Sequence, residues 1–286
     1  MVGALARREF PLLPTDMNGW IVAALLGALC VVLAVRILGE RARRKQQGLF
    51  SPWPIKRIRL HELDPVFTPG PFGPTIATEV SFIGRGPIRV PGGTSDAEAW
   101  ILAVLAKRAE RLFEFGTCTG KTAYLWSRNA PEHARINTLT LAPSQQHEYV
   151  KGAEDTDQDT KFALNESVFE EFLYSGTACA ERVGQLYGDS KQFDETPYLD
   201  WADLVFVDGS HARSYVESDS VKAMRIVKPG GLVLWHDYAG PGHAPGVFQA
   251  LNALAGTVPL RHVDDTTFAM WRRPESSPRL ERPLRP

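Results

Sequence analysis

The sequence predicts an α/β fold, in which a mostly parallel sheet carries helices on both faces and follows one apolar helix near the N-terminus. Between residues 95 and 272, short apolar runs alternate with segments of helical periodicity. Such alternation is typical of parallel sheets, because a helix usually connects two parallel strands. Residues 19–38 form a separate segment with a single charge. The chain is therefore expected to combine one α/β domain with an apolar appendage.

The composition is that of an ordinary globular chain and excludes some classes of partner. The 286 residues are 44% hydrophobic and 23% charged, with a net charge of −1, so bulk electrostatics give no reason to expect a nucleic-acid partner. The three cysteines, Cys30, Cys118 and Cys179, contain no C-x-x-C pair. Neither a disulfide framework nor a zinc site is expected. Nothing in the composition specifies an oligomeric state.

Residues 19–38 are predicted to be a transmembrane helix. Arg36 can snorkel to the membrane surface, which leaves an apolar length close to the ~30 Å of a bilayer core. Trp20 is placed as an interfacial anchor. A soluble core helix would have a polar face, and a cleaved signal peptide would end in small residues. This segment has neither feature, so we expect a membrane-anchored, single-pass protein.

The charges beside this segment predict its orientation. Five cations follow its apolar core: Arg36, Arg41, Arg43, Arg44 and Lys45. Before it, in the tail 1–18, only Arg7 and Arg8 occur, offset by Glu9 and Asp16. Because cytoplasmic flanks carry the excess of Lys and Arg, the C-terminal domain is predicted to be cytoplasmic.

Composition also marks the domain boundaries. Residues 39–94 are basic at first and then rich in Pro and Gly, which rules out a long helix or a central strand and predicts a juxtamembrane linker. Ser95 and Glu98 have the spacing of a capping box and predict a helix at the start of the domain 95–272. The Pro- and Arg-rich residues 273–286 are predicted to be a disordered tail.

Seven strands and their connecting helices are expected within the domain. The strand candidates are 111–115, 136–141, 183–187, 204–207, 232–235, 260–263 and 268–271. The further helical candidates are 121–128, 143–151, 162–174, 213–227 and 246–255. The last two strands are too close in sequence for a crossover helix. They should therefore form an antiparallel hairpin at one edge of the sheet.

The turn after the first of these strands predicts a cofactor site. Glu114 ends the strand, and Gly116 and Gly120 bracket the loop before the next helix, with Thr117 between them. This strand–glycine–helix turn directs backbone N–H groups into a crevice. A carboxylate at Glu114 would repel a pyrophosphate but attract an ammonium group or a hydroxyl. The pattern favours S-adenosylmethionine (SAM) over NAD, and a side chain at Gly116 is expected to fill the space of the cofactor without disturbing the fold.

Polar residues follow three later strands and are expected at the same sheet edge. Asp189 and Ser190 follow one strand, Asp208 the next, and Asp237 the one after. Neighbouring strands lie ~4.8 Å apart, so Asp208 and Asp237 either share a hard cation such as Mg²⁺, raise one pKa, or are neutralised by backbone N–H groups and a Lys or Arg.

Two histidines compete for the role of general base beside these carboxylates. Alternation along the strand directs His236 away from Asp237 and into the sheet packing. His211, three residues after Asp208, is therefore the predicted base.

These motifs in their order resemble a class I SAM-dependent methyltransferase, closest to bacterial metal-dependent O-methyltransferases that act on macrolide sugars. The resemblance covers about residues 95–272 and implies a Rossmann-like, seven-stranded sheet with an edge hairpin. It implies Mg²⁺ on Asp208 and Asp237 and a base at His211. Cofactor contacts are expected from Glu114, Gly116, Thr117, Gly120, Thr140, Asp189, Ser190 and Asp208.

One position departs from the family. Thr140 stands where an acidic residue normally binds the ribose hydroxyls, and losing that charge-assisted pair costs on the order of 1–3 kcal/mol. Four other acids, Asp155, Asp157, Asp159 and Glu166, have calcium-loop spacing. Thr160 occupies the place of the required Gly, so a solvated loop near the crevice is expected.

The sequence thus predicts a membrane-anchored SAM-dependent O-methyltransferase, Mg²⁺-assisted, that acts on a hydroxyl of a small molecule or glycan. Two alternatives stay open. One is a non-catalytic, membrane-anchored binding or assembly protein with this fold, which Thr140 favours. The other is an oxidoreductase or hydroxylase on the same fold, because related folds host other chemistry.

Overall fold

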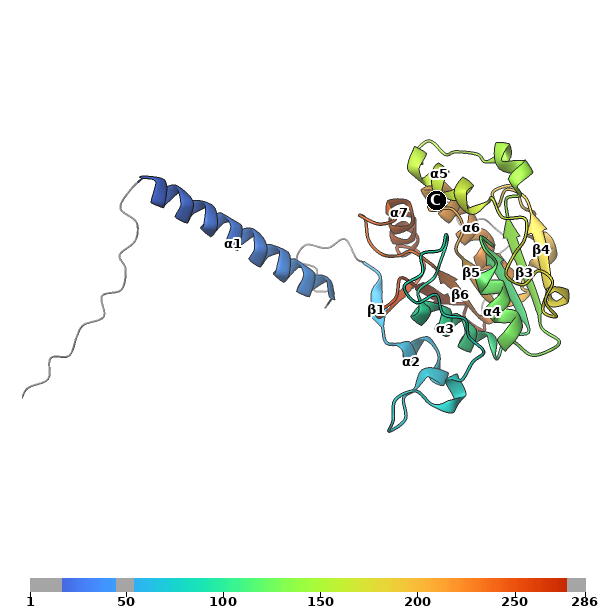
Figure 1. Ribbon diagram of the computed structural model, residues 1–286. Helices are drawn as coiled ribbons and strands as arrows, with labels where there is room; N and C mark the ends of the chain where they lie inside the picture. The colour runs from blue at the N-terminus through green and yellow to red at the C-terminus, as the bar shows by residue number, and fades with distance from the viewer. Residues whose placement is uncertain (1–16, 45–53, 277–286) are drawn as a thin grey trace, which may run out of the picture. The chain divides into compact units, whose positions relative to one another are not determined.

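The computed structural model describes residues 17–44 and 54–276, which form two separate compact units (Figure 1). Predictions for residues 1–16, 45–53 and 277–286 lie outside the described residues. They concern the N-terminal tail with its charges, Lys45 and the other residues near the start of the linker, and most of the C-terminal tail.

The first described unit is one helix, α1, Met17–Arg44. Its stretch Gly19–Gly39 is long and apolar enough to cross a membrane, with a mean hydropathy of 2.8 and none of that window buried. An apolar surface of this size needs a lipid or protein environment. This stretch is a candidate span by its length and composition alone, so its location in a membrane stays a prediction.

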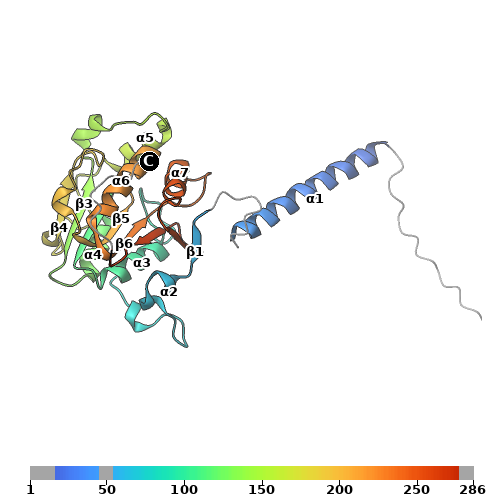
Figure 2. The ribbon, with the colours of Figure 1, turned by 180° about the vertical axis from the view of Figure 1, so that it is seen from behind.

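The second unit is built on an eight-stranded sheet with the order β1-β7-β8-β6-β5-β2-β3-β4 (Figures 1 and 2). The strands are β1 Lys56–Ile58, β2 Arg111–Phe115, β3 Arg135–Thr140, β4 Val183–Tyr187, β5 Ala202–Val207, β6 Val227–Trp235, β7 Arg261–Val263 and β8 Ala269–Arg272. All neighbours are parallel except β8, which is antiparallel to β6 and β7. The predicted Rossmann-like sheet with an antiparallel hairpin near one edge is confirmed.

The sheet has one strand more than the seven predicted. β1 lies in the Pro- and Gly-rich segment that the sequence assigns to a linker, and it pairs with β7 at the edge of the sheet. An edge strand of three residues needs hydrogen bonds on one side only, so nearby prolines do not prevent it.

Helices cover both faces of the sheet, α3 and α4 one face and α6 and α7 the other (Figures 1 and 2). The helices are α2 Leu60–Leu63, α3 Asp96–Ala106, α4 Lys121–Asn129, α5 Asp157–Glu166, α6 Arg213–Ile226 and α7 Pro245–Leu254. The Ser95–Glu98 capping box begins α3 as predicted. Trp126 of α4 packs on Phe206 of β5 with ring centroids 6.4 Å apart, which fixes α4 against the sheet.

Two helical predictions are wrong in detail. The segment predicted as a helix over 143–151 is a 3₁₀ helix, Pro143–Glu148. The helix predicted over 162–174 begins earlier, at Asp157, and ends at Glu166. Thr156 sets the new start, because its hydroxyl accepts a hydrogen bond from the Asp159 N–H at 3.1 Å. A capped N-terminus of this kind satisfies one of the free donors of the first turn.

Candidate active site

A cavity lies at the carboxyl ends of the central strands, where the strand order reverses between β2 and β5. Ligands of open α/β sheets bind at such a switch point. The cavity encloses about 540 Å³, part of it open to solvent. Five of the residues predicted for the cofactor line it: Gly116, Thr140, Asp189, Ser190 and Asp208. Their contacts with a cofactor stay a prediction, but the chain brings all five together.

The glycine loop between β2 and α4 is shaped by close backbone packing. Gly116 has a φ of +98°, and a Cβ there would lie 2.0 Å from the carbonyl oxygen of Asp208. A side chain at this position would therefore collide with the end of β5 before it reached the cavity. The expectation that Gly116 tolerates a larger residue without damage to the fold is wrong, since only glycine permits this approach.

Glu114 lies behind the cavity and is absent from its lining. The residue is 1% exposed, and its Oε2 accepts a hydrogen bond from the Thr138 hydroxyl at 2.6 Å. Burial raises the pKa of Glu114 to about 8, so the carboxyl is neutral at pH 7. The expected attraction between a Glu114 carboxylate and a cationic ligand loses its basis, because a neutral acid carries no charge to the cavity.

Two more predicted cofactor residues lie outside the lining. The Thr117 hydroxyl is 2.7 Å from that of Thr138, in the same buried group as Glu114. Gly120 lies under Phe172 and Tyr174, whose atoms would be within 3 Å of a Cβ at this position. The loop is therefore held from both sides, and only its first residues face the cavity.

Glu114→Gln is expected to flatten the pH dependence of stability. The pKa of Glu114 is raised from 4.5 to about 8 on folding, so its contribution is fully present below pH 4.5 and is lost as the pH rises through 8. The variant should gain up to about 4 kcal/mol over the wild type between these limits. Urea unfolding of both proteins at pH 5 and pH 8.5 measures this; equal slopes against pH would contradict a buried, neutral Glu114.

One side of the cavity is formed in part by Tyr149, in the segment before α5, and this segment is held against α6. The Tyr149 ring stacks on that of Tyr215 at 4.5 Å, and the Tyr215 hydroxyl accepts a hydrogen bond from the Val150 N–H at 2.9 Å. Asp155 accepts hydrogen bonds from the N–H groups of Gly152 at 2.6 Å and Ser214 at 3.1 Å. The acidic stretch beside the crevice thus contributes Glu166 to the lining of the cavity, and it is part helix rather than the predicted solvated loop.

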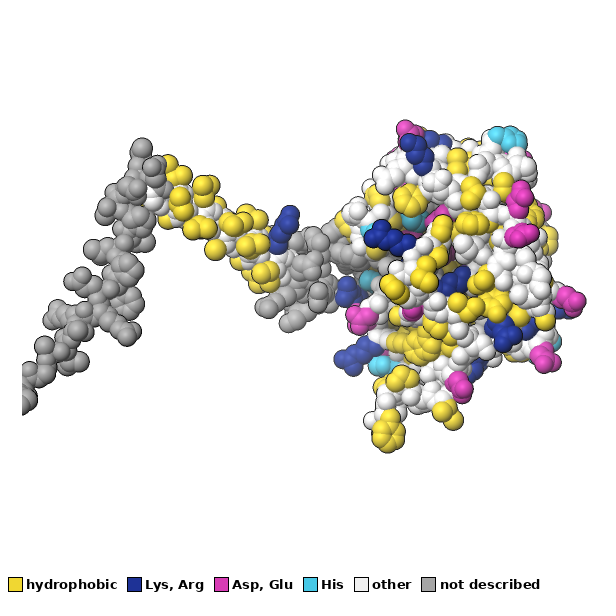
Figure 3. Space-filling view, viewed as in Figure 1, with side chains coloured by type: hydrophobic (Ala, Val, Ile, Leu, Met, Phe, Trp, Pro, Cys, Tyr) yellow, Lys and Arg dark blue, Asp and Glu magenta, His cyan; other side chains and the backbone are white. Residues whose placement is uncertain are grey.

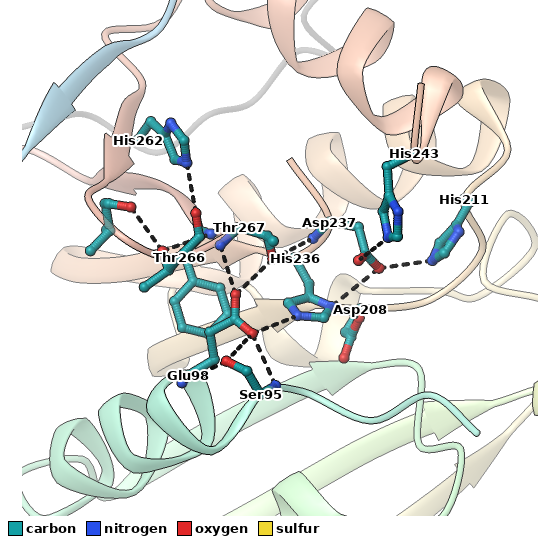
Figure 4. A network of polar contacts seen from close by, with 12 residues as sticks. Ser95, Glu98, Asp208, His211, His236, Asp237, His243, His262, Thr266 and Thr267 are labelled. Carbon is teal, nitrogen blue, oxygen red and sulfur yellow. Dashed lines mark hydrogen bonds and ion pairs between the residues drawn. The ribbon is translucent and has the colours of Figure 1, made fainter. Parts of the chain in front are cut away.

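A second group of polar residues lies beside this cavity, on the ends of β5 and β6 (Figure 4). His236 Nδ1 is 2.8 Å from Asp208 Oδ1 and 3.1 Å from Asp237 Oδ2. His211 Nε2 is 2.8 Å from the same oxygen of Asp237. We call Asp208, His211, His236 and Asp237 the acid–histidine cluster. Asp208 also lines the cofactor cavity, so the two sites adjoin at this residue.

The prediction for His236 is wrong in the direction of the side chain. Its ring does touch Phe206 and Phe268, but its Nδ1 faces both carboxylates. Alternation fails here because Asp237 has a φ of 60°, a left-handed conformation that turns the chain at the end of β6. Non-glycine residues in this region are favoured only by surrounding contacts and occur often at functional sites.

Those contacts come from Glu98, a residue that the sequence reasoning assigned only to capping. Glu98 Oε1 accepts hydrogen bonds from the N–H and hydroxyl of Thr267 at 2.7 and 2.8 Å, and the Thr267 hydroxyl accepts the Asp237 N–H at 3.2 Å. Glu98 Oε2 is also 3.5 Å from His236 Nε2. In the sequence, only the capping-box spacing marked Glu98. Nothing in the sequence indicated its long-range contacts with Thr267 and His236.

Burial and mutual charge set the ionisation of the cluster. Burial raises the pKa of Asp208. Although burial opposes its charge, Asp237 raises the pKa of His211 through their hydrogen bond. Burial and the nearby Asp208 raise the pKa of Glu166 to about 7. Glu166 lies at the end of α5 and lines the cavity, so it adds a third acid that the sequence reasoning rejected as a calcium ligand.

The cluster has a donor set that fits a divalent cation. Asp208, His236 and Asp237 each offer one ligand atom, and these atoms lie within 4.8 Å of one another. Two carboxylates are ligands for Mg²⁺ or Mn²⁺, while the imidazole nitrogen is more typical of the transition metals. The predicted pair Asp208 and Asp237 is therefore adjacent as expected, and His236 is a third candidate ligand.

Comparison with known proteins agrees with this architecture. Residues 113–238 match a family described as a methyltransferase domain. No curated protein sequence matches the chain. Residues 113–238, from the first motif to just after β6, are thus similar to a methyltransferase domain.

Solved structures with a similar fold have low identity to the chain. The SAM complex of the O-methyltransferase TomG from Streptomyces achromogenes, involved in tomaymycin synthesis, is 20% identical with a TM-score of 0.43, and the match covers 64% of this chain and 82% of that one. The SAH-bound methyltransferase PaMTH1 from Podospora anserina is 18% identical with a TM-score of 0.45, covering 65% and 82%. An O-methyltransferase from Bacillus cereus in complex with SAH is 14% identical with a TM-score of 0.40, covering 63% and 81%. At these values the ligands of this chain must be argued from its own residues.

Proposed function

We propose that the chain, whose residues 113–238 match a methyltransferase domain, transfers a methyl group from SAM to a hydroxyl of a small-molecule or glycan acceptor. A divalent cation, with Mg²⁺ as the first candidate, assists at Asp208 and Asp237. One observation carries the proposal. Asp208 lines both the cofactor cavity and a smaller pocket of about 240 Å³ that contains His211, His236 and Asp237. A methyl donor and an acceptor hydroxyl held in these two spaces would meet at Asp208.

The lining of the cavity suits the polar nucleoside part of SAM. Thr140, Asp189 and Ser190 provide hydroxyl and carboxylate oxygens at the ends of β3 and β4. The Thr140 hydroxyl would make a single hydrogen bond with a ribose hydroxyl, at a position where the family normally has a carboxylate. When bound, SAM supplies an electrophilic methyl group on sulfur. The protein contributes mainly proximity and alignment, which can lower a barrier by several kcal/mol.

The acid–histidine cluster provides the proton acceptor. His211 Nε2 is hydrogen-bonded to Asp237 at 2.8 Å, so the carboxylate orients the ring and stabilises its protonated form. The ring of Phe162 stacks on that of His211 with centroids 5.6 Å apart, which limits its movement. A cation on Asp208 and Asp237, with His236 as a third donor, would lower the pKa of the acceptor hydroxyl.

Binding of the methyl donor is the first expected result. The full chain in detergent should bind SAM and S-adenosylhomocysteine (SAH) with a stoichiometry of one per chain in a calorimetric titration, and should not bind NAD. Binding of SAH without methyl transfer to any hydroxyl acceptor would favour the non-catalytic alternative, for which the absence of an acid at Thr140 is the motivating feature. Binding of NAD instead of SAM would favour the oxidoreductase.

The membrane anchor is the second part of the proposal. Gly19–Gly39 has the length and hydropathy of a span, and the excess of cations after it supports a cytoplasmic domain. A C-terminal reporter enzyme is expected to be active in the cytoplasm, and the chain should stay in the membrane after carbonate extraction. A soluble chain would contradict the anchor. An exported reporter would contradict the orientation and leave the span intact.

A further inference from the structure

Exposed hydrophobic side chains in residues 54–276 concentrate on two segments. Eleven large hydrophobic residues are exposed in this described part of the chain, four of them on residues 82–90 and three on residues 162–173. Scattered exposed hydrophobic residues are normal, but a contiguous group marks a binding surface. The concentration on two short segments is therefore informative only if the segments meet.

The two segments do meet, and they meet beside the acid–histidine cluster. A Cβ on Gly92, next to the first segment, would lie 2.5 Å from Cys118 Sγ and 3.4 Å from Glu166 Oε1. In the second segment, Phe162 stacks on His211. We call the exposed hydrophobic residues of both segments the apolar rim: Phe82, Ile83, Ile88, Val90, Phe162, Val168 and Leu173. In Figure 3, hydrophobic side chains gather on this face of the domain.

The interior of the opening is acidic. Asp208 and Glu166 line the same cavity, and the ligand atoms of Asp208 and Asp237 lie within 4.8 Å of each other. Glu166 lies outside the donor set of the proposed cation, so its carboxylate stays available to repel an anionic group next to the reacting hydroxyl, while a neutral group is not repelled. The rim in turn offers apolar surface to the part of the acceptor that stays outside the cluster. Apolar surface removed from water on binding contributes affinity in proportion to its area.

We propose that the methyl acceptor is a neutral, lipid-like hydroxyl compound, whose hydroxyl enters the acid–histidine cluster while its apolar body lies against the apolar rim. The inference rests on the methyltransferase function proposed above and specifies its substrate class. The apolar helix α1 of the same chain supports this choice, because a membrane is where such compounds concentrate. A free, water-soluble sugar would leave the rim uncovered.

A homologous series of catechols tests the proposal, because adjacent hydroxyls suit a dication and the alkyl length varies alone. The full chain, in lipid nanodiscs with SAH and Mg²⁺, is titrated with catechol and with its 4-methyl, 4-propyl and 4-butyl derivatives. The Kd is expected to fall about twofold to fourfold per methylene, fourfold being complete burial. Catechol carrying a carboxylate should bind more weakly than catechol itself.

Matched variants distinguish binding of the alkyl chain at the apolar rim from partition of the catechols into the bilayer. Ile88→Ser and Val168→Ser should lose most of the gain with chain length. Ile76→Ser, at a residue that is 89% exposed and outside the rim, should keep the gain in affinity with chain length. Partition of each catechol into the bilayer is the same for all variants. A flat series, equal gains in all variants, stronger binding of the carboxylate, or no binding of any catechol would overturn the inference. Failure of the wild type to bind SAH would instead overturn the proposed function.

Discussion

Asp237→Asn is expected to abolish the metal dependence of methyl transfer and to lower kcat by about 10²-fold or more. A neutral amide is a poor ligand for a hard dication, and it no longer stabilises the protonated His211, whose Nε2 lies 2.8 Å from Asp237 Oδ2. The fold should tolerate the change, because Asn adopts the left-handed conformation as readily as Asp does. Steady-state rates with and without a chelator, at saturating SAM, measure the effect.

Asp265→Asn is the matched control for this substitution. Asp265 has a φ of 58°, almost that of Asp237, but it is exposed and outside the cluster. Its variant should keep both activity and metal response, while Asp208→Asn should resemble Asp237→Asn. A wild-type enzyme that is insensitive to chelator, or an Asp237→Asn enzyme that still responds to metal, would contradict a cation at these carboxylates.

The strand ends could be predicted from the sequence because they depend on local patterns. The acidic and glycine residues follow apolar runs of strand length, and parallel strands bring such ends to one edge whatever the details of packing. Asp189, Ser190 and Asp208 therefore line one cavity as the order of the motifs implied. The same reasoning placed His211 beside Asp237, since both follow neighbouring strands.

The side-chain directions at the site could not be predicted, because they depend on backbone exceptions and distant contacts. The left-handed φ of Asp237 turns His236 toward the carboxylates, and it is supported by Thr267 and Glu98, which are far from it in sequence. Likewise Glu114 looks like a cavity residue by its place at a strand end. Only the hydrogen bond from Thr138, on the neighbouring strand, shows that it points behind the loop.

His211→Ala is expected to reduce turnover by about 10²–10⁴-fold, the usual worth of a general base, while SAH and metal binding stay within about threefold of the wild type. The residue contacts Asp237 and Phe162 but does not line the cofactor cavity. Because the pKa of His211 is raised above 6.5, the ring is protonated and inactive as a base at low pH. Activity should therefore rise with pH, with its midpoint above 6.5, and the rise should disappear in the variant.

Two other histidines distinguish this role from a general effect of charge near Asp237. His236→Ala removes the ring that bridges Asp208 and Asp237 and contacts Glu98. Three largely buried carboxylates then lose their shared partner, so the melting temperature and the metal affinity should both fall. His243 Nε2 lies 3.9 Å from Asp237, with its side chain 65% exposed, and His243→Ala should leave rate, stability and pH profile unchanged. If His236→Ala stopped turnover in a protein of normal stability and metal affinity, while His211→Ala remained active, the base would be His236.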